Sequence, residues 1–342
     1  MQTSYDILFI TTMSAFYKVN LFNAVAQHKR ILVVYTGSAT GIRSKDFIKN
    51  NACYDQITLK NSAYSAIGQF MTLIRRTTFE RVVISGWDNV ISFLTTIVFP
   101  KQKMACIVES SIYESSTKGL RALPKRFLLR RVNLVYASGK SQTDLVRALG
   151  YKGVVTEFGG CGILNYQPQP AFERREVVKQ FLYVGQLVEK KNVGLLIDYF
   201  NEHPELTLTI IGDGILKEHL KTSANNNIVF LGAIDNNKLP QYYKEADVFI
   251  LPSKIEPWGL VVEEALNNGT PVIVSSRVGC AQSLVKPYDT GLIFESENRK
   301  ELSDCIEKVL DEEYYNQLRK NVSLLDFESR AEYQIQCFCK NV

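Results

Sequence analysis

Two glutamates stand eight positions apart, Glu256 in a loop with Pro and Gly, and Glu264 one turn into a predicted helix. A carboxylate accepts two hydrogen bonds from a vicinal diol, so Glu264 could hold a ribose while Glu256 orients a sugar near its anomeric carbon. Unpaired backbone N–H groups at the helix start could bond a diphosphate, and they belong to Gly259, Leu260 and Val261. The stretch therefore suits a sugar nucleotide. Taken alone, it also fits a loop and a surface helix with solvated glutamates.

The segments around this motif predict how it is positioned. An apolar run at 248–252 precedes it, and Gly269 followed by a second apolar run at 271–275 comes after it. The order is strand, loop, helix, glycine stop and strand, which is one βαβ unit. Ligands of such sheets sit beyond the carboxyl ends of the strands, where the 252–260 loop is predicted to lie.

Five sequence blocks occur in the order found in the retaining glycosyltransferases of family 4, which this chain resembles. The blocks are Tyr183–Lys191, Ile211–Gly214, Phe230–Gly232, Glu256–Glu264 and Gly269–Val272. Together they cover most of residues 180–295. Before residue 160 the resemblance is weaker and rests on Ser85–Asn89, Glu109–Ser111 and the alternation of strand and helix.

The resemblance implies an α/β protein of the GT-B architecture, with two Rossmann-like parallel-sheet domains facing a central cleft. Residues 1–165 would form the N-terminal, acceptor-binding domain, and residues 172–325 the C-terminal, nucleotide-sugar-binding domain. Residues 326–342 would form a helix that crosses back to the N-terminal domain. A turn-rich segment with several Gly and Pro residues, around 158–170, would link the two domains.

Hydrophobic periodicity independently predicts two parallel sheets covered by helices. The predicted strands are 6–12, 30–36, 81–85, 103–108 and 133–137 in the first half, and 180–184, 207–211, 228–231, 247–251, 271–275 and 291–294 in the second. The predicted helices of the first half are 17–28, 64–76, 89–98, 119–131 and 140–149, and the chain reads as helical from residue 298 onward.

By resemblance, a second loop at Gly185–Lys191 would contact the phosphates of the donor. Lys191 would neutralise the charge that builds up on the leaving nucleoside diphosphate. Gln186 stands where an Arg is common in the family, so it can donate hydrogen bonds but carries no charge. Gly232 and Trp258 complete the predicted donor-binding residues, the backbone near Gly232 contacting the nucleobase. The alternative for Lys191 is a solvated lysine at a helix start.

The first domain departs furthest from the family. The Gly-rich loop after the first strand and the His after the fourth are both missing. Glu109 is predicted at the carboxyl end of a strand, where it could bind a sugar hydroxyl of donor or acceptor. Glu256, Lys191 and Glu109 are therefore the predicted catalytic residues. The alternative for Glu109 is a carboxylate that caps a loop.

No residue pattern favours a metal ion. The sequence contains no Asp-x-Asp, and the three histidines, His28, His203 and His219, are scattered without ligand spacing. Because diphosphate-stabilising metals require clustered carboxylates, we expect a metal-independent reaction with no cofactor beyond the sugar nucleotide.

Charge is distributed unevenly along the chain. Residues 1–165 hold 21 Lys and Arg against 9 Asp and Glu, a net charge of +12, whereas the remainder holds 19 against 26, a net charge of −7. A basic domain attracts nucleic acid, anionic lipid or diphosphates. Nucleic acid is the weakest of these because no binding motif accompanies the charge.

A basic amphipathic segment at 119–131 predicts contact with an anionic membrane surface. Its expected contacts are Arg121, Lys125, Arg126 and Arg130. The alternative is a domain helix with its leucines in the core and its cations solvated.

The cysteines and apolar segments suggest a location. Seven cysteines at irregular spacing favour a reducing compartment. No apolar run approaches the roughly 18–20 residues of a transmembrane helix, and the N-terminus has no basic leader or cleavage site. We expect a cytoplasmic protein that would lie on the inner face of the membrane if it associates with one.

The sequence thus predicts a glycosyltransferase of the hexosyltransferase type that moves a sugar, with retention, from a nucleoside-diphosphate sugar to an acceptor hydroxyl. The acceptor would be a lipid-linked glycan or a surface polysaccharide precursor, as in lipopolysaccharide synthesis. Two alternatives stay open: a GT-B-like sugar-nucleotide epimerase, and a catalytically silent subunit that only binds a sugar nucleotide. An epimerase needs acid and base groups at the sugar carbon.

Overall fold

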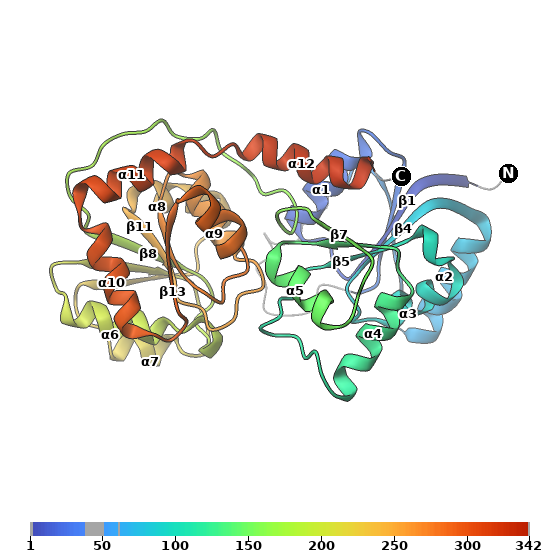
Figure 1. The fold of residues 1–342 in the computed structure, drawn as a ribbon, viewed down its shortest axis with the longest axis horizontal. Helices are drawn as coiled ribbons and strands as arrows, with labels where there is room; N and C mark the ends of the chain where they lie inside the picture. Colours follow the sequence, from blue (N-terminus) through green and yellow to red (C-terminus); the bar gives the residue numbers. More distant parts are fainter. Residues whose placement is uncertain (1–2, 38–50, 61, 341–342) are drawn as a thin grey trace. The chain divides into compact units, whose positions relative to one another are not determined.

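Two parallel β-sheets organise the chain, each within its own folding unit. The computed structural model describes residues 3–37, 51–60 and 62–340 (Figure 1). The first unit comprises Met1–Asn165 and Glu328–Val342, and the second comprises Tyr166–Phe327. Of the linker predicted around 158–170, residues 158–165 belong to the first unit and the rest to the second. There the Gln167 N–H donates to Asn267 Oδ1 (2.7 Å).

The sheet of the first unit has seven parallel strands in the order β3-β2-β1-β4-β5-β6-β7. The strands are β1 (Thr3–Thr11), β2 (Ile31–Tyr35), β3 (Asp55–Thr58), β4 (Thr77–Ser85), β5 (Met104–Val108), β6 (Leu134–Ala137) and β7 (Val154–Glu157). The helices are α1 (Phe16–Ala26), α2 (Ala63–Arg76), α3 (Val90–Val98), α4 (Leu123–Arg130), α5 (Lys140–Ala148) and, from the end of the chain, α12 (Phe327–Cys339). All five strands predicted in this half are confirmed.

Alternate residues of the inner strands divide the core between the two faces of this sheet. On β1, Leu8 and Ile10 pack into one buried cluster, and Ile7 and Phe9 pack into the other. Side chains of a strand point alternately to its two faces. A strand buried on both faces therefore reads as a continuous apolar run, which is why the inner strands could be predicted.

The two edge strands, β3 and β7, were missed by the sequence analysis. All four residues of β3 are exposed, and β7 is only partly buried. An edge strand with a solvated face has no long apolar run, so hydrophobic periodicity does not detect it.

The second unit has a six-stranded parallel sheet in the order β10-β9-β8-β11-β12-β13. Its strands are β8 (Gln180–Val184), β9 (Thr207–Ile211), β10 (Ile228–Gly232), β11 (Val248–Leu251), β12 (Val272–Ser275) and β13 (Gly291–Phe294). The helices are α6 (Val193–Glu202), α7 (Lys217–Thr222), α8 (Leu239–Glu245), α9 (Leu260–Asn267), α10 (Arg299–Val309) and α11 (Glu312–Ser323). All six predicted strands are confirmed.

Each sheet contains one point at which the strand order reverses. The reversal lies between β1 and β4 in the first unit and between β8 and β11 in the second. Loops leaving two adjacent strands diverge there and leave a crevice at the carboxyl edge, where doubly wound proteins bind ligands. The reversal point of each unit is therefore the place to look for a site.

Helix α12 contributes to the core of the first unit although it follows the whole second unit in sequence. Phe338 is fully buried, with its ring centroid 5.7 Å from that of Phe9, 4.4 Å from Tyr136 and 5.6 Å from Phe158. The three partners come from β1, β6 and the segment after β7. The helix is thus an integral part of the first unit.

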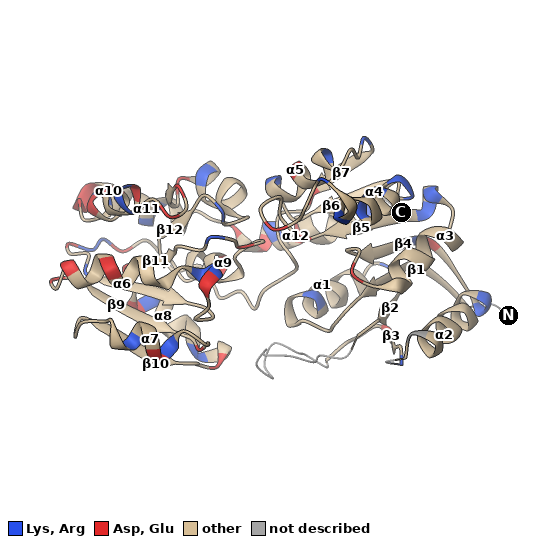
Figure 2. Cartoon of the chain, turned by 90° about the horizontal axis from the view of Figure 1, so that it is seen from below, with Lys and Arg blue, Asp and Glu red and all other residues tan. Residues whose placement is uncertain are grey.

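Charged residues are distributed unevenly between the elements of the two units. Figure 2 shows blue segments around α4 in the first unit and red segments on α6 and α10 in the second. Within the described ranges, no helix is long and apolar enough to cross a membrane.

The basic segment at 119–131 forms a short turn at Leu120–Ala122 followed by α4, and two of its cations are engaged with the protein. Lys125 Nζ donates to Ser115 Oγ (2.6 Å) and to the Ser116 carbonyl (2.9 Å). Arg126 Nη2 donates to the Thr117 carbonyl (3.0 Å). Lys125 therefore holds the preceding loop, and burial lowers its pKa. The predicted contact of this segment with a membrane stays a prediction. Arg121 and Arg130 are exposed.

Replacing Phe338 by Ala should destabilise the first unit by about 3–5 kcal/mol, the usual cost of removing a buried aromatic side chain. Urea unfolding followed by circular dichroism measures the change. Glu332→Ala, an exposed change on the same helix, is the matched control and should leave the midpoint near that of the native chain. Equal midpoints for both variants would contradict the role of Phe338 in the core.

Candidate active site

A glycine lies at the carboxyl end of each of three neighbouring strands in the second unit, β8, β9 and β10, and these glycines contact one another. The Gly185 N–H donates to the Ile211 carbonyl (2.9 Å), and the Gly212 N–H donates to the Gly232 carbonyl (2.8 Å). A Cβ on Gly212 would lie 1.8 Å from the Gly185 carbonyl oxygen. The loops after β8, β9 and β10 therefore contact one another through backbone atoms at glycines. Gly185 and Gly232 of the predicted donor site both lie at the carboxyl edge of this sheet.

The loop after β8 rests on the turn that follows β9. The Leu187 N–H donates to the Asp213 carbonyl (2.9 Å), and the Leu216 N–H donates to the Leu187 carbonyl (3.1 Å). A Cβ on Gly214 would lie 2.3 Å from that same carbonyl oxygen. Gly212-Asp213-Gly214 is thus a packing turn that supports the 185–191 loop. Gln186, near the beginning of the supported loop, is exposed.

The loop after β11 is fixed in a similar way by the turn after β12. The Gly279 N–H donates to the Glu256 carbonyl (2.9 Å), and the Glu256 N–H donates to the Arg277 carbonyl (3.2 Å). A Cβ on Gly279 would lie 1.8 Å from the Pro257 carbonyl oxygen. The backbone on both sides of Glu256 is therefore held in place.

Lys191 and Glu256, one from each loop at the reversal point, form an ion pair between Nζ and Oε2. Their side chains are 13% and 14% exposed. An ammonium group has three donors, so Lys191 can keep this partner and still offer an N–H to a phosphate oxygen. The structure thus brings together two of the three predicted catalytic residues.

Helix α9 begins beside this pair. Its N-cap residue, Gly259, has φ +100°, a left-handed conformation that favours glycine. The Val262 N–H already donates to the Gly259 carbonyl (2.9 Å). The other N–H groups of the first turn, those of Leu260 and Val261, have no acceptor within the helix and remain for an anion.

Glu264 lies on the second turn of α9 and accepts a hydrogen bond from Tyr243 Oη (2.9 Å). Burial raises the pKa of its carboxyl to about 7. The hydrogen bond from Tyr243 opposes this shift, and the charge of Glu263 adds to it. One carboxyl oxygen is occupied by Tyr243, and the other remains for a ligand hydroxyl.

Trp258 has a structural role that the sequence analysis did not foresee. Its side chain is 2% exposed, and its indole Nε1–H donates to Oε2 of the fully buried Glu263 (2.9 Å). The ring therefore cannot stack on a donor. It anchors the loop that carries Glu256, and only its backbone could contribute to binding.

In the first unit, Glu109 follows β5 and forms an ion pair with Lys18 of α1 (2.8 Å). Lys18 Nζ also lies 3.5 Å from Thr11 Oγ1 at the end of β1. The second oxygen of Glu109, Oε1, is buried without a hydrogen-bond partner among the described residues. A buried acceptor of this kind is costly unless a ligand donates to it.

Lys18, Tyr243 and Glu263 were missed by the sequence analysis. Lys18 had a usable signal, because it follows the first strand within one loop length. The other two could be recognised only by their contacts with Glu264 and Trp258.

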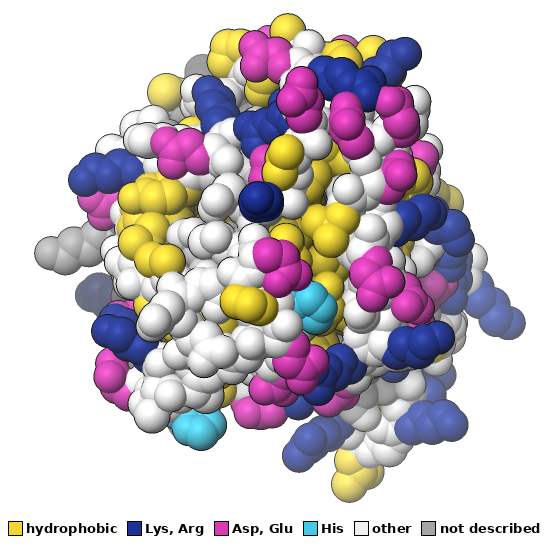
Figure 3. All heavy atoms as spheres, turned by 90° about the vertical axis from the view of Figure 1, so that its left-hand side faces the viewer, with side chains coloured by type: hydrophobic (Ala, Val, Ile, Leu, Met, Phe, Trp, Pro, Cys, Tyr) yellow, Lys and Arg dark blue, Asp and Glu magenta, His cyan; other side chains and the backbone are white. Residues whose placement is uncertain are grey.

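The described residues include no group of three or more His, Cys, Asp or Glu side chains placed to hold a metal ion. On the face of the second unit shown in Figure 3, acidic and basic side chains are interspersed and the histidines stand apart.

Comparison with known proteins agrees with this arrangement. Residues 169–323 match the family described as glycosyl transferases group 1. The second unit is a group 1 glycosyl transferase domain. A relative named sulfoquinovosyl transferase, from Arabidopsis thaliana, is 34% identical over 131 residues, which span 37% of this chain and 25% of that protein. The chain thus matches only a quarter of the relative's length.

Similarity to solved structures extends over both units. Sucrose-phosphate synthase from Thermosynechococcus elongatus has a TM-score of 0.75 and 18% identity, covering 98% of each chain. Anabaena HepE in complex with UDP-glucose has a TM-score of 0.68 and 16% identity, covering 99% of this chain and all of that one. These likenesses confirm the predicted GT-B fold with its two Rossmann-like parallel-sheet domains.

The raised pKa of Glu264 predicts a pH-dependent stability. Its folded-state value of about 7 lies above the ordinary 4.5, so ionisation opposes folding. The contribution of this carboxyl is largest below pH 4.5 and is lost as the pH rises through about 7, a change of up to about 3 kcal/mol. Urea unfolding between pH 4.5 and 8 should show this loss in the native chain and not in Glu264→Gln. Parallel pH profiles for the two proteins would contradict the assignment.

Proposed function

We propose that this protein is a retaining glycosyltransferase that moves a sugar from a nucleoside diphosphate to an acceptor hydroxyl without a metal ion. The observation that carries the proposal is the Lys191–Glu256 pair at the reversal point of the second unit. This pair supplies a cation for phosphate and a carboxylate for sugar hydroxyls. It lies close to the N-terminus of α9, where the backbone N–H groups of Leu260 and Val261 are available to a ligand. The group 1 domain and the resemblance to a protein bound to UDP-glucose support a sugar nucleotide as donor.

In this proposal the second unit binds the donor. Glu264 accepts from the ribose hydroxyls, Lys191 and the first N–H groups of α9 hold the diphosphate, and Glu256 orients the sugar. Gln186 lies at an exposed position on the phosphate side, where it adds hydrogen bonds but no charge.

The proposed reaction takes place on one face of the sugar. As the bond to the leaving phosphate breaks, Lys191 stabilises the charge that develops on it. The leaving phosphate oxygen accepts the proton of the acceptor hydroxyl, and the new bond forms on the same face. Glu109 of the first unit would hold a hydroxyl of the acceptor through its unpartnered oxygen.

The proposed acceptor is a lipid-linked glycan or a surface polysaccharide precursor, bound by the basic first unit. The protein would then work in the cytoplasm at the inner face of the membrane.

The proposed membrane-facing surface lies around α4. Exposed Leu120, Leu123 and Phe127 lie beside Arg121 and Arg130 and would contact the membrane. Salt-sensitive sedimentation with anionic vesicles, reduced in Arg121→Glu, is the expected result. Equal sedimentation of both proteins would contradict it.

Turnover of a panel of nucleoside-diphosphate sugars, with and without acceptor extracts, tests the function. We expect turnover that depends on the acceptor and persists in EDTA. Loss of all turnover in EDTA with recovery in Mg²⁺ or Mn²⁺ would contradict metal independence. Epimerised donor without acceptor would establish the epimerase, and donor binding without any turnover would establish a silent binding subunit.

Replacing Glu256 by Gln should lower kcat by about 10- to 100-fold, because one charged hydrogen bond to the reacting sugar is worth about 1.5–3 kcal/mol. Glu264→Ala should instead weaken donor binding, because its contact is with the ribose. Steady-state kinetics separate the two effects. Glu189→Gln, an exposed carboxylate in the 185–191 loop that pairs with Lys254, is the control and should retain native kinetics. Native kinetics in all three variants would reject the site.

A further inference from the structure

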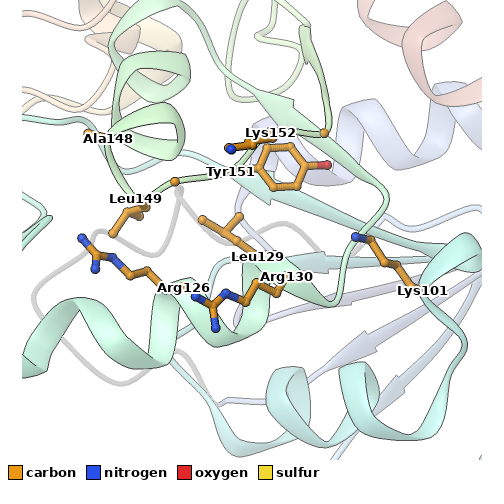
Figure 4. A pocket seen from close by; sticks show the side chains of 10 residues that line it. Lys101, Arg126, Leu129, Arg130, Ala148, Leu149, Tyr151 and Lys152 are labelled. Carbon is orange, nitrogen blue, oxygen red and sulfur yellow. The ribbon is translucent and has the colours of Figure 1, made fainter.

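A pocket of about 470 Å³ opens on the first unit, away from the carboxyl edge of its sheet. It lies between α4, the end of α5 and the segments that lead into β5 and β7 (Figure 4). Lys101 precedes β5, and Lys152 precedes β7. Both therefore belong to the amino-terminal edge, whereas Lys18 and Glu109 belong to the carboxyl edge. The pocket is separate from the proposed active site.

Four cations line this pocket: Lys101, Arg126, Arg130 and Lys152. No carboxylate is among the lining residues, and none of the four cations forms an ion pair within the part of the chain that the structure describes. Arg126 donates one N–H to the Thr117 carbonyl, and its buried Nε has no hydrogen-bond partner there. Four positive charges around one pocket repel one another, and a bound anion would reduce this repulsion.

The walls of the pocket are built from fixed groups. Leu129 and Tyr151 are buried. Arg147 fixes the loop between α5 and β7 by donating to the carbonyls of Tyr151 (2.8 Å) and Gly153 (2.9 Å). Gly150, between these elements, has φ +89°, which favours glycine at this turn. The cations therefore surround a preformed surface.

We propose that this pocket binds the phosphate group of a phosphate ester. Phosphate carries a charge of about −1.5 to −2 at neutral pH and has three acceptor oxygens. Two guanidinium groups can bind those oxygens in a bidentate manner, and two ammonium groups add charge. A single carboxylate would leave the cluster strongly positive.

The pocket has room for more than the phosphate. Ligand pockets for small molecules are about 300–1,000 Å³, and this one falls within that range. The attached group is either a soluble metabolite or a membrane lipid. Leu123 and Phe127, 54% and 47% exposed, lie on α4 beside Arg126 and Arg130 and provide an apolar neighbour for the lipid source.

The test compares two charge-matched double variants. Lys101→Gln with Lys152→Gln removes two exposed pocket cations that do not belong to the proposed membrane-facing surface around α4, and Lys60→Gln with Arg76→Gln removes two exposed cations elsewhere on the same unit. The probes are glycerol 3-phosphate, measured by calorimetry at low salt, and phosphatidylcholine vesicles containing phosphatidic acid, measured by sedimentation. Thermal unfolding checks that each variant folds.

We expect the pocket variant to lose at least about ten-fold in affinity for one or both probes, while the control variant stays within about two-fold of the native chain. Loss for both probes supports a phosphate site open to soluble esters. Loss for the vesicles alone supports a lipid headgroup site. Equal losses in the two double variants, or no binding of either probe by the native chain at low salt, would overturn the proposal. Because binding is measured without turnover, these results do not depend on the proposed reaction.

Discussion

Direct contact between backbone segments without side chains organises the carboxyl edge of the second sheet. Gly212 and Gly214 let the turn after β9 touch the loop after β8, and Gly279 lets the turn after β12 touch the loop after β11. Each contact is closed by backbone hydrogen bonds of about 3 Å. A methyl group at any of these three positions would overlap a carbonyl oxygen. The positions of Lys191 and Glu256 depend on these contacts, because both side chains extend from loops that the glycines hold.

A rigid frame of this kind suits opposite charges that must stay close while a ligand enters. Lys191 and Glu256 are mostly shielded from solvent, so their attraction is stronger than that of a surface pair. Removing either partner would leave the other as a partly buried, unpaired charge. In the first unit, Lys18 and Glu109 form another such pair, from the segments that follow β1 and β5. Each unit thus places at least one lysine–glutamate pair at the carboxyl edge of its sheet.

Much of the fold could be predicted from the sequence because both sheets are parallel and buried. Their inner strands are continuous apolar runs, and the block from Glu256 to Glu264 identified the loop and helix of the site. The side-chain contacts within that block could not be predicted. Trp258 and Glu263 bind each other in the core, and Lys125 turns toward a loop. Sequence spacing gives the face of a helix but not the neighbour that packs on it. The edge strands β3 and β7 lack the apolar run on which strand prediction depends.

The first unit is built from two stretches of sequence, with the second unit inserted between Asn165 and Glu328. Phe338 fills the space among Phe9, Tyr136 and Phe158 only when the last helix is present. During synthesis on the ribosome the chain emerges from its N-terminus, and domains fold as units. The second unit is therefore complete while the first still lacks an aromatic ring in its core. The part of the protein that is made first is the last to reach its native state.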